Sequence, residues 1–169
     1  MQERLGPERP ISSSEELRDP YRSDEGTPCG GNHRRAATTM IEEKAKILVV
    51  EDNAALSGVI CFNLVRAGFQ VTSVNNGRLG LDAAQKGAFD LVLSDQQMPL
   101  MTGIQLCEHL REMPVYRRTP FILLTAKCME IDFQKLQKKL GISAALPKPF
   151  SPSELVTCIE DCLAAGCRS

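Results

Sequence analysis

Short apolar runs alternate with amphipathic helical segments between residues 46 and 165, and this alternation most constrains the fold. The run Ile47-Leu48-Val49-Val50 is short and continuous, which is typical of a parallel strand buried on both faces. Strands are predicted at 47–50, 69–74, 90–94, 121–124 and 143–146. Helices are predicted at 54–67, about 79–87, 103–112, about 133–140, and from residue 151 onward.

Five strand–helix alternations with short connections imply one parallel sheet covered on both faces by right-handed crossovers. The predicted fold class is therefore α/β, with a doubly wound five-stranded sheet. In such sheets, functional residues lie at the carboxyl ends of the strands, near the point where the strand order reverses.

Helix boundaries and buried faces follow from local sequence. Gly68 and Gly141 are expected to end two helices, and Ser151, Pro152 and Glu154 form a capping box that starts the last one. The predicted inward residues are Leu56, Ile60, Leu64 and Val65 in the first helix, Phe133, Leu136 and Leu140 in the fourth, and Leu155, Ile159, Cys162 and Leu163 in the last.

The first 43 residues are rich in Pro, Ser and Gly and have few large apolar side chains. We expect a flexible, disordered tail over 1–43 and one domain over 44–169. Met40, directly before the ordered pattern, is an alternative translation start. A net charge of -1 and no apolar run near the roughly 20 residues of a membrane helix predict neither nucleic-acid nor membrane partners.

Seven cysteines without a CxxC pair favour reduced thiols in a cytoplasmic protein. Cys158 and Cys162 are four residues apart and share one helix face. We expect them to act as small buried apolar side chains; a metal or redox pair is the alternative.

The predicted strand ends carry a distinctive set of side chains. Glu51 and Asp52 follow the first strand, Asp95 the third, Thr125 the fourth and Lys148 the fifth. Crowded carboxylates require a cation among them, and oxygen ligands of this kind suit Mg²⁺. A hydroxyl and an ammonium beside them suit the oxygens of a transferred phosphoryl group. The set therefore predicts a Mg²⁺-dependent phosphoryl site.

Each of these residues has a simpler interpretation when taken alone. Asp52 could cap a helix, Thr125 could be an ordinary strand-end hydroxyl, and Lys148 could be a solvated loop charge. Their joint occurrence on consecutive strand ends favours the phosphoryl site.

The same segments resemble the receiver domain of response regulators over about residues 45–165. The run Asp95-Gln-Gln-Met-Pro-Leu-Met-Thr-Gly103 matches the family pattern D-x-x-M-P-x-M-x-G. The segments Glu51-Asp52-Asn53, Leu124-Thr125-Ala126 and Leu146-Pro-Lys148-Pro-Phe150 match its acidic, hydroxyl and lysine motifs. The resemblance implies a flavodoxin-like (βα)5 fold with strand order 2-1-3-4-5.

The resemblance also implies a role for each matching residue. Asp95 would accept phosphate from a sensor histidine kinase or a histidine phosphotransfer protein. Asp52 would bind Mg²⁺ directly and Glu51 mainly through water, with Asp95 and the backbone carbonyl of Gln97 completing the metal site. Thr125 and Lys148 would contact the phosphoryl oxygens. Such a domain catalyses only its own phosphorylation and dephosphorylation, and is not an enzyme acting on an external substrate. A cis peptide bond is expected before Pro149.

Two features depart from the family pattern. Ala145 stands three residues before Lys148, where receivers usually carry an aromatic ring that moves inward on activation. Gln97 and Lys127 occupy positions beside the path of the water that removes the phosphoryl group, so we expect slow self-dephosphorylation. Alternatively, both are exposed side chains of little effect.

The sequence ends shortly after the last predicted helix, at Ser169, so we expect a stand-alone receiver that signals by altered partner binding. The expected contact surface is the face formed by the fourth helix, the fifth strand and the last helix, where Lys135, Lys138 and Lys139 project. The alternative is an adaptor of the same fold that binds partners without phosphorylation. A haloacid-dehalogenase-type phosphatase would need an Asp where Gln97 stands.

Overall fold

Strands and helices alternate along the chain in the computed structural model, which describes residues 44–126 and 133–166. The strands are β1 (Lys46–Val50), β2 (Gln70–Val74), β3 (Leu91–Asp95), β4 (Phe121–Thr125) and β5 (Ala144–Pro147). The helices are α1 (Ala54–Arg66), α2 (Gly77–Lys86), α3 (Gly103–Glu112), α4 (Phe133–Leu140) and α5 (Pro152–Gly166), with a short 3-10 turn, η1 (Pro114–Tyr116). The predicted elements are confirmed with ends shifted by one or two residues.

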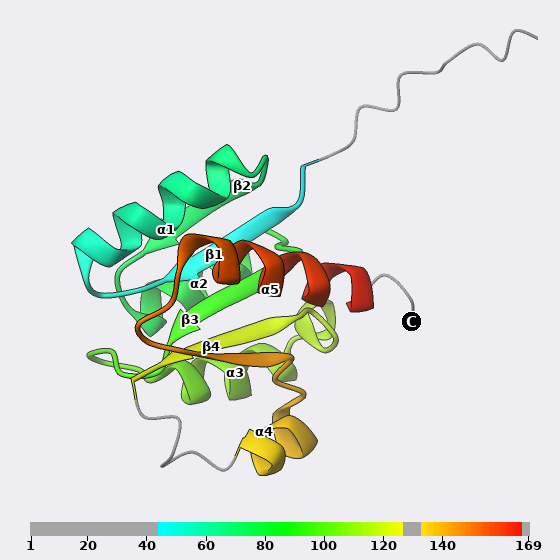
Figure 1. Cartoon of the computed structure of the whole chain (residues 1–169). Helices are drawn as coiled ribbons and strands as arrows, with labels where there is room; N and C mark the ends of the chain where they lie inside the picture. Colours follow the sequence, from blue (N-terminus) through cyan, green and yellow to red (C-terminus); the bar gives the residue numbers. More distant parts are fainter. Residues whose placement is uncertain (1–43, 127–132, 167–169) are drawn as a thin grey trace, which may run out of the picture. The chain divides into compact units, whose positions relative to one another are not determined.

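The five strands form one parallel sheet in the order β2-β1-β3-β4-β5 (Figure 1). The chain runs outward from β1 to β2 and then returns to place β3 on the other side of β1. This reversal puts the carboxyl ends of β1 and β3 at the topological switch point, where ligands bind in such sheets. The predicted fold class and strand order are confirmed.

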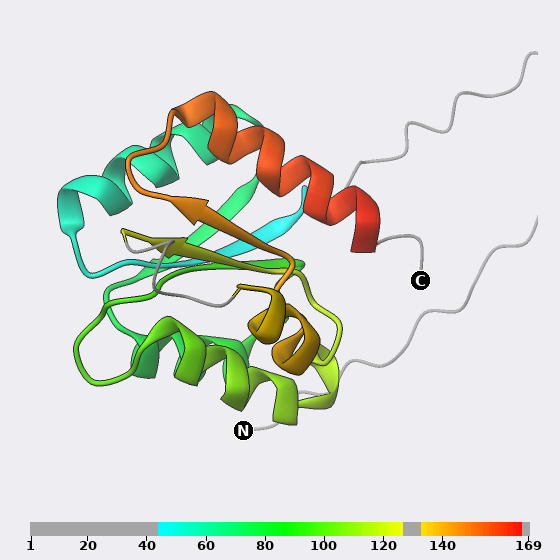
Figure 2. The same cartoon turned by 60° about the horizontal axis from the view of Figure 1, so that its bottom comes forward.

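Both faces of the sheet are covered by helices, with α1 and α5 on one face and α2, α3 and α4 on the other (Figure 2). Alternate residues of each central strand enter opposite cores. In β1, Leu48 and Val50 pack with the α2–α3–α4 side, and Ile47 and Val49 pack with the α1–α5 side. Burial on both faces explains why the central strands are continuous apolar runs.

Helix starts are fixed by side-chain caps. The Leu56 N–H donates to Asn53 Oδ1 at 3.1 Å at the start of α1, and a capping box centred on Thr102 starts α3. The predicted box at Ser151 is confirmed, because the Ser151 N–H donates to Glu154 Oε2 at 2.7 Å and the Glu154 N–H donates to Ser151 Oγ at 3.2 Å.

Most predicted helix faces are confirmed, but the assignment of Val65 needs correction. Val65 is 59% exposed rather than inward, because it lies about 100° around the helix from buried Leu64. Cys162 and Leu163 are half-buried at the edge of the core, beside fully buried Ile159. The buried stripe of α1 is thus narrower than predicted, and that of α5 is confirmed with Cys162 and Leu163 at its margin.

The predicted tail, 1–43, lies outside the described residues, so its flexibility stays a prediction. Within the described ranges, no helix has the length and apolar character that a membrane span requires.

Candidate functional site

The sheet register brings the predicted site residues to one edge. Val50 pairs with Ser94 across β1 and β3, so Glu51 and Asp95 follow as neighbours. Asp95 pairs with Leu124, which places Thr125 one residue further along β4, and Thr125 pairs with Pro147, which is followed by Lys148. Asp95 and Thr125 are the last residues of their strands rather than the first residues after them.

Three carboxylates meet at this edge. One oxygen each of Glu51, Asp52 and Asp95 lies within 4.8 Å of the other two. Glu51 is 2% exposed and Asp95 is 7% exposed, whereas Asp52 is exposed to solvent. Two of the three negative charges are therefore removed from water, and the third stands at the solvent side of the cluster.

Lys148 supplies positive charge to the two buried carboxylates. Its Nζ donates to Glu51 Oε2 at 2.8 Å and lies 3.1 Å from Asp95 Oδ2. The Lys148 side chain is only 21% exposed. One ammonium thus bridges β1 and β3 from the loop that follows β5.

Burial raises the pKa of the Glu51 carboxyl, and the nearby Asp95 charge raises it further. The hydrogen bond and charge of Lys148 lower the pKa, as does the Asn53 N–H, which donates to Glu51 Oε1 at 3.3 Å. The net shift is upward, so Lys148 does not fully offset the cost of burying Glu51. The carboxylate cluster can therefore accommodate a further cation, and its all-oxygen donors suit a hard divalent ion such as Mg²⁺.

Asp52 does not cap α1, because Asn53 fills that position through the Leu56 N–H. The N-cap interpretation of Asp52 is therefore wrong. Sequence reasoning missed Asn53, although Asn is among the strongest N-cap residues and directly precedes the helix. Asn53 thus fixes the start of α1 directly after exposed Asp52 and buried Glu51.

The loop after Asp95 is held tightly against the sheet. The Gln96 N–H donates to Leu124 O at 2.9 Å, and Gln96 Oε1 accepts from the Ile104 N–H at 3.1 Å. A Cβ on Gly103 would overlap the Asp95 carbonyl oxygen and would lie 2.8 Å from Leu123 Cδ1. The glycine of the D-x-x-M-P-x-M-x-G run is thus required because α3 begins against the backbone of Asp95.

The lysine loop is held against β4 by its backbone, since the Lys148 N–H donates to Thr125 O at 2.9 Å. Thr125 is buried. The predicted cis peptide bond between Lys148 and Pro149 is confirmed. Thr125 and Lys148 therefore flank Asp95 from the β4–β5 side.

The remaining predicted residues take the following positions. Gln97 is exposed in the loop after β3. Ala145 is half-buried in β5 and pairs with Leu123, on the sheet face that α3 and α4 cover. Lys127 lies outside the described residues, so its predicted effect on dephosphorylation stays a prediction.

Known proteins are similar to this chain in sequence and in fold. The family of response regulator receiver domains matches this chain over residues 47–160. Among curated proteins, the probable transcriptional regulator ycf29 of Pyropia yezoensis is 38% identical over 119 residues, covering 70% of this chain and 53% of that protein. The alkaline phosphatase synthesis transcriptional regulatory protein PhoP of Bacillus subtilis is 36% identical over 110 residues, covering 65% of this chain and 45% of that protein. The chain spans about half the length of these relatives.

Solved structures match over nearly their whole length. The chemotaxis response regulator CheY4 of Vibrio cholerae has a TM-score of 0.66 and 32% identity, covering 70% of this chain and 98% of that one. The receiver domain of the sensor histidine kinase PA1611 from Pseudomonas aeruginosa, solved with magnesium in its active site cleft, has a TM-score of 0.66 and 30% identity, covering 72% of this chain and 98% of that one. The family match, the strand order and the motifs together show that this chain belongs to the response-regulator family and carries its receiver domain, a phosphorylation-accepting module of two-component signalling.

Proposed function

We propose that residues 44–169 form a receiver domain that accepts a phosphoryl group on Asp95 from a sensor histidine kinase or a histidine phosphotransfer protein. The observation that carries the proposal is the position of Asp95. It ends the central strand β3 with one carboxylate oxygen 3.1 Å from Lys148 Nζ, inside a three-carboxylate cluster. A nucleophile held between a cation and a candidate metal site is the arrangement that phosphoryl transfer requires.

Mg²⁺ is the proposed cofactor, held by Asp52, Asp95 and the backbone carbonyl of Gln97, with Glu51 acting mainly through water. When bound, the ion would neutralise the carboxylate cluster and the incoming phosphoryl oxygens. Thr125 and Lys148 would contact the remaining phosphoryl oxygens. The buried ion pair between Glu51 and Lys148 supports the indirect role of Glu51, because both of its carboxylate oxygens already accept hydrogen bonds.

Labelling with a small phosphodonor tests the proposal. Acetyl phosphate with Mg²⁺ is expected to add one acid-stable, base-labile phosphoryl group to the parent protein and none to Asp95→Asn. Asp82→Asn, which removes a half-buried carboxylate on α2 whose side chain lies 3.8 Å from Arg78 Nε, is the matched control and should label like the parent. Equal labelling of Asp95→Asn and the parent would show that another residue accepts the phosphate.

The burial pattern predicts how the metal site responds to substitution. We expect Mg²⁺ to bind the unphosphorylated domain weakly and to shift the amide resonances near Asp52 and Asp95 at millimolar concentration. Asp52→Asn should weaken Mg²⁺ binding more than Glu51→Gln, because Asp52 is exposed whereas Glu51 is buried against Lys148. The absence of any shift at millimolar metal would contradict the site, and a larger loss in Glu51→Gln would reverse the ranking.

The alanine at position 145 is expected to reduce the conformational change that phosphorylation causes. Phosphorylation is expected to draw Thr125 toward the phosphate, but a methyl group at position 145 offers no ring to fill the space that Thr125 leaves. Beryllofluoride, a phosphoryl mimic, should therefore cause smaller amide shifts in β5 and α4 of the parent than in Ala145→Tyr. Shifts that are equally large and far-reaching in both proteins would show that the missing ring has little effect.

Signalling is proposed to occur in the cytoplasm through a protein partner that contacts the face formed by α4, β5 and α5. On that face Lys135 and Lys138 are exposed, while Lys139 Nζ lies 2.9 Å from Glu108 Oε1 of α3. Two of the matched relatives are named as transcriptional regulators. The expectation that this chain has no nucleic-acid partner therefore gains no support from them.

A phosphorylation-independent adaptor is the second candidate. The burial of Glu51 and Asp95 argues against it. An adaptor gains nothing from two carboxylates removed from water, since replacing them with apolar side chains would remove their desolvation cost.

A further inference from the structure

Leu100, in the loop between β3 and α3, carries a side chain that the fold does not bury. At 84%, it is the most exposed large apolar side chain within the described ranges. It is also the one non-glycine residue of those ranges with a positive φ, of 71°. The Met101 N–H donates to Pro99 O at 2.8 Å and closes a three-residue γ-turn around Leu100. This form of the γ-turn is rare and strained, and a bulky side chain adds to its cost.

The residues around Leu100 are held on both sides, so its exposed position is fixed by the fold. A Cβ on Gly77, the first residue of α2, would lie 2.7 Å from Met101 O. The residue after Leu100 is therefore packed directly against α2. The Gly103 N–H donates to Gln96 O at 3.2 Å and closes the loop at the start of α3. The loop thus presents an apolar side chain to solvent from a well-anchored base.

Leu100 lies on the rim of the proposed phosphoryl site. The loop leaves Asp95 and returns to it, because a Cβ on Gly103 would overlap the Asp95 carbonyl oxygen. Leu100 is three residues before Gly103, so their Cα atoms are at most about 11 Å apart. A transient protein interface of about 500–800 Å² on each partner is roughly 25–30 Å across. A protein whose surface is centred on Asp95 therefore reaches Leu100.

We propose that Leu100 is a contact residue for the protein that donates phosphate to Asp95, and that its side chain packs into an apolar surface of that histidine kinase or phosphotransfer protein. The inference rests on the proposed function, because the position of Asp95 decides where the donor must bind. Burial of the leucine in the complex removes apolar surface from water that the free domain leaves exposed. A small phosphodonor has no such surface, so Leu100 favours protein donors over small molecules.

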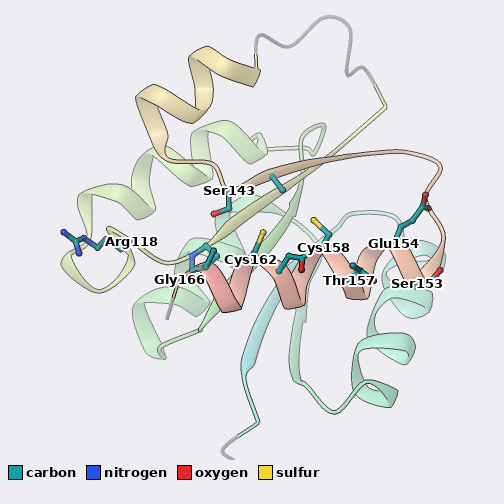
Figure 3. Close-up of a pocket in the computed structure, with 12 residues that line it drawn as sticks. Arg118, Ser143, Ser153, Glu154, Thr157, Cys158, Cys162 and Gly166 are labelled. Carbon is teal, nitrogen blue, oxygen red and sulfur yellow. The ribbon is translucent and has the colours of Figure 1, made fainter. Parts of the chain in front are cut away.

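A groove of about 870 Å³ along α5 offers an alternative surface for a donor (Figure 3). It includes Cys158 and Cys162, whose thiols are half-buried, so the expected burial of these two side chains is only partial. None of the proposed phosphoryl-site residues lines the groove. A molecule seated in it would contact none of the side chains that a donor must approach. We therefore assign the donor contact to Leu100.

The test compares a protein donor with a small one on Leu100→Asn. Asparagine tolerates a positive φ, so the turn is retained while the apolar side chain is removed. The protein donor is a sensor histidine kinase, autophosphorylated with ATP and selected for transfer to the parent chain. Its KM should rise about 10-fold with kcat nearly constant, since an apolar contact made equally in the bound complex and in the transition state affects binding alone. The ratio of the kinase kcat/KM to the acetyl phosphate rate constant should therefore fall about 10-fold.

Two further substitutions separate a donor contact from a structural role. Leu100→Met keeps an apolar side chain of similar volume and should retain the ratio of the parent. Leu100→Gly relieves the strain of the positive φ, so its melting temperature should rise by about 2–4 °C while its ratio falls as in Leu100→Asn. A lower melting temperature would show that Leu100 stabilises the free domain and would overturn the proposal.

Val115→Ser and Ala165→Arg are the controls for other surfaces. Val115 is 65% exposed on η1, which precedes β4 at the sheet edge opposite Asp95, and its substitution should retain the ratio of the parent. Ala165→Arg puts a bulky charge into the α5 groove at an exposed position and should also retain it. The proposal fails if Leu100→Asn and Val115→Ser give equal ratios, or if Ala165→Arg lowers the ratio and Leu100→Asn does not.

Failure of this inference is distinguishable from failure of the proposed function. Equal ratios for Leu100→Asn and the parent, with acetyl phosphate still labelling Asp95, would remove the donor contact alone. Labelling of Asp95→Asn as readily as of the parent would instead contradict the proposed function itself.

Discussion

Replacing Lys148 with methionine is expected to slow phosphorylation of Asp95 by acetyl phosphate about 100-fold, because it removes a preorganised positive charge from the reacting group. The ammonium also holds Glu51 and Asp95 at 2.8 Å and 3.1 Å. Without it, two carboxylates that are largely shielded from water face each other. We therefore expect the free energy of unfolding to fall by about 1–3 kcal/mol in the absence of Mg²⁺, because the buried Glu51 carboxylate loses a hydrogen-bond donor, and by less when Mg²⁺ restores positive charge.

Lys139 provides a matched control for Lys148. Its Nζ lies 2.9 Å from Glu108 Oε1, almost the same distance as in the Lys148–Glu51 pair, but its side chain is 65% exposed. Lys139→Met should change stability by less than about 1 kcal/mol and leave phosphorylation unaltered. Denaturant unfolding with and without Mg²⁺ measures the stability of Lys148→Met and Lys139→Met, and labelling with acetyl phosphate measures their phosphorylation rates. Equal effects of the two substitutions would mean that burial of the pair is unimportant.

Gly103→Ala is expected to destabilise the domain by about 1–3 kcal/mol, since the new methyl group would meet the Asp95 carbonyl oxygen and Leu123 Cδ1. The clash cannot be relieved by rotating a flexible side chain, because one partner is backbone. Either α3 or the end of β3 must move, and such a shift displaces the nucleophile. The phosphorylation rate should therefore fall about 10- to 100-fold even in the protein that remains folded.

Gly58→Ala is the control for this substitution. Gly58 lies inside α1, and a Cβ there would have no heavy atom within 4 Å. The substitution should stabilise the domain by about 0.5–1 kcal/mol, because alanine loses less backbone freedom on folding. In thermal unfolding, the melting temperature is expected to fall for Gly103→Ala and to rise for Gly58→Ala. A Gly103→Ala protein as stable and as readily phosphorylated as the parent would contradict the close approach of α3 to Asp95.

The sheet and the rim of the site could be predicted because each depends on local sequence patterns. Runs such as Ile47–Val50 have the composition of doubly buried strands, and the order of strand ends follows from chain connectivity. Asp95, Thr125 and Lys148 could therefore be assigned to one edge without coordinates. The motif resemblance added the strand order, which periodicity alone does not determine.

Side-chain pairing at the site could not be predicted in the same way. A lysine side chain is long enough to reach several partners, so the sequence does not determine that Lys148 bridges Glu51 and Asp95. Asp52 and Asn53 are both good helix caps, and only the backbone around α1 decides that Asn53 fills this position.

The exposure of residues at the margin of a buried helix face could not be predicted from the sequence. Val65 lies about 100° around α1 from buried Leu64 and so falls outside the inward stripe, whereas Cys162 fits the stripe of α5 by spacing but lies at its margin. At Val65 the side chain is left in solvent, and at Cys162 it lines a groove. Helical periodicity gives the direction of a face but not its width.

The central claim is that Asp95 accepts the phosphoryl group within a Mg²⁺ site at the carboxyl edge of the sheet. A crystal structure of the protein with Mg²⁺ and beryllofluoride tests it most directly. The account predicts beryllofluoride on the Asp95 carboxylate, in contact with Thr125 and Lys148, and Mg²⁺ bound by Asp52, Asp95 and the Gln97 carbonyl. Beryllofluoride on another residue, or Mg²⁺ bound without Asp52 and Asp95, would contradict it.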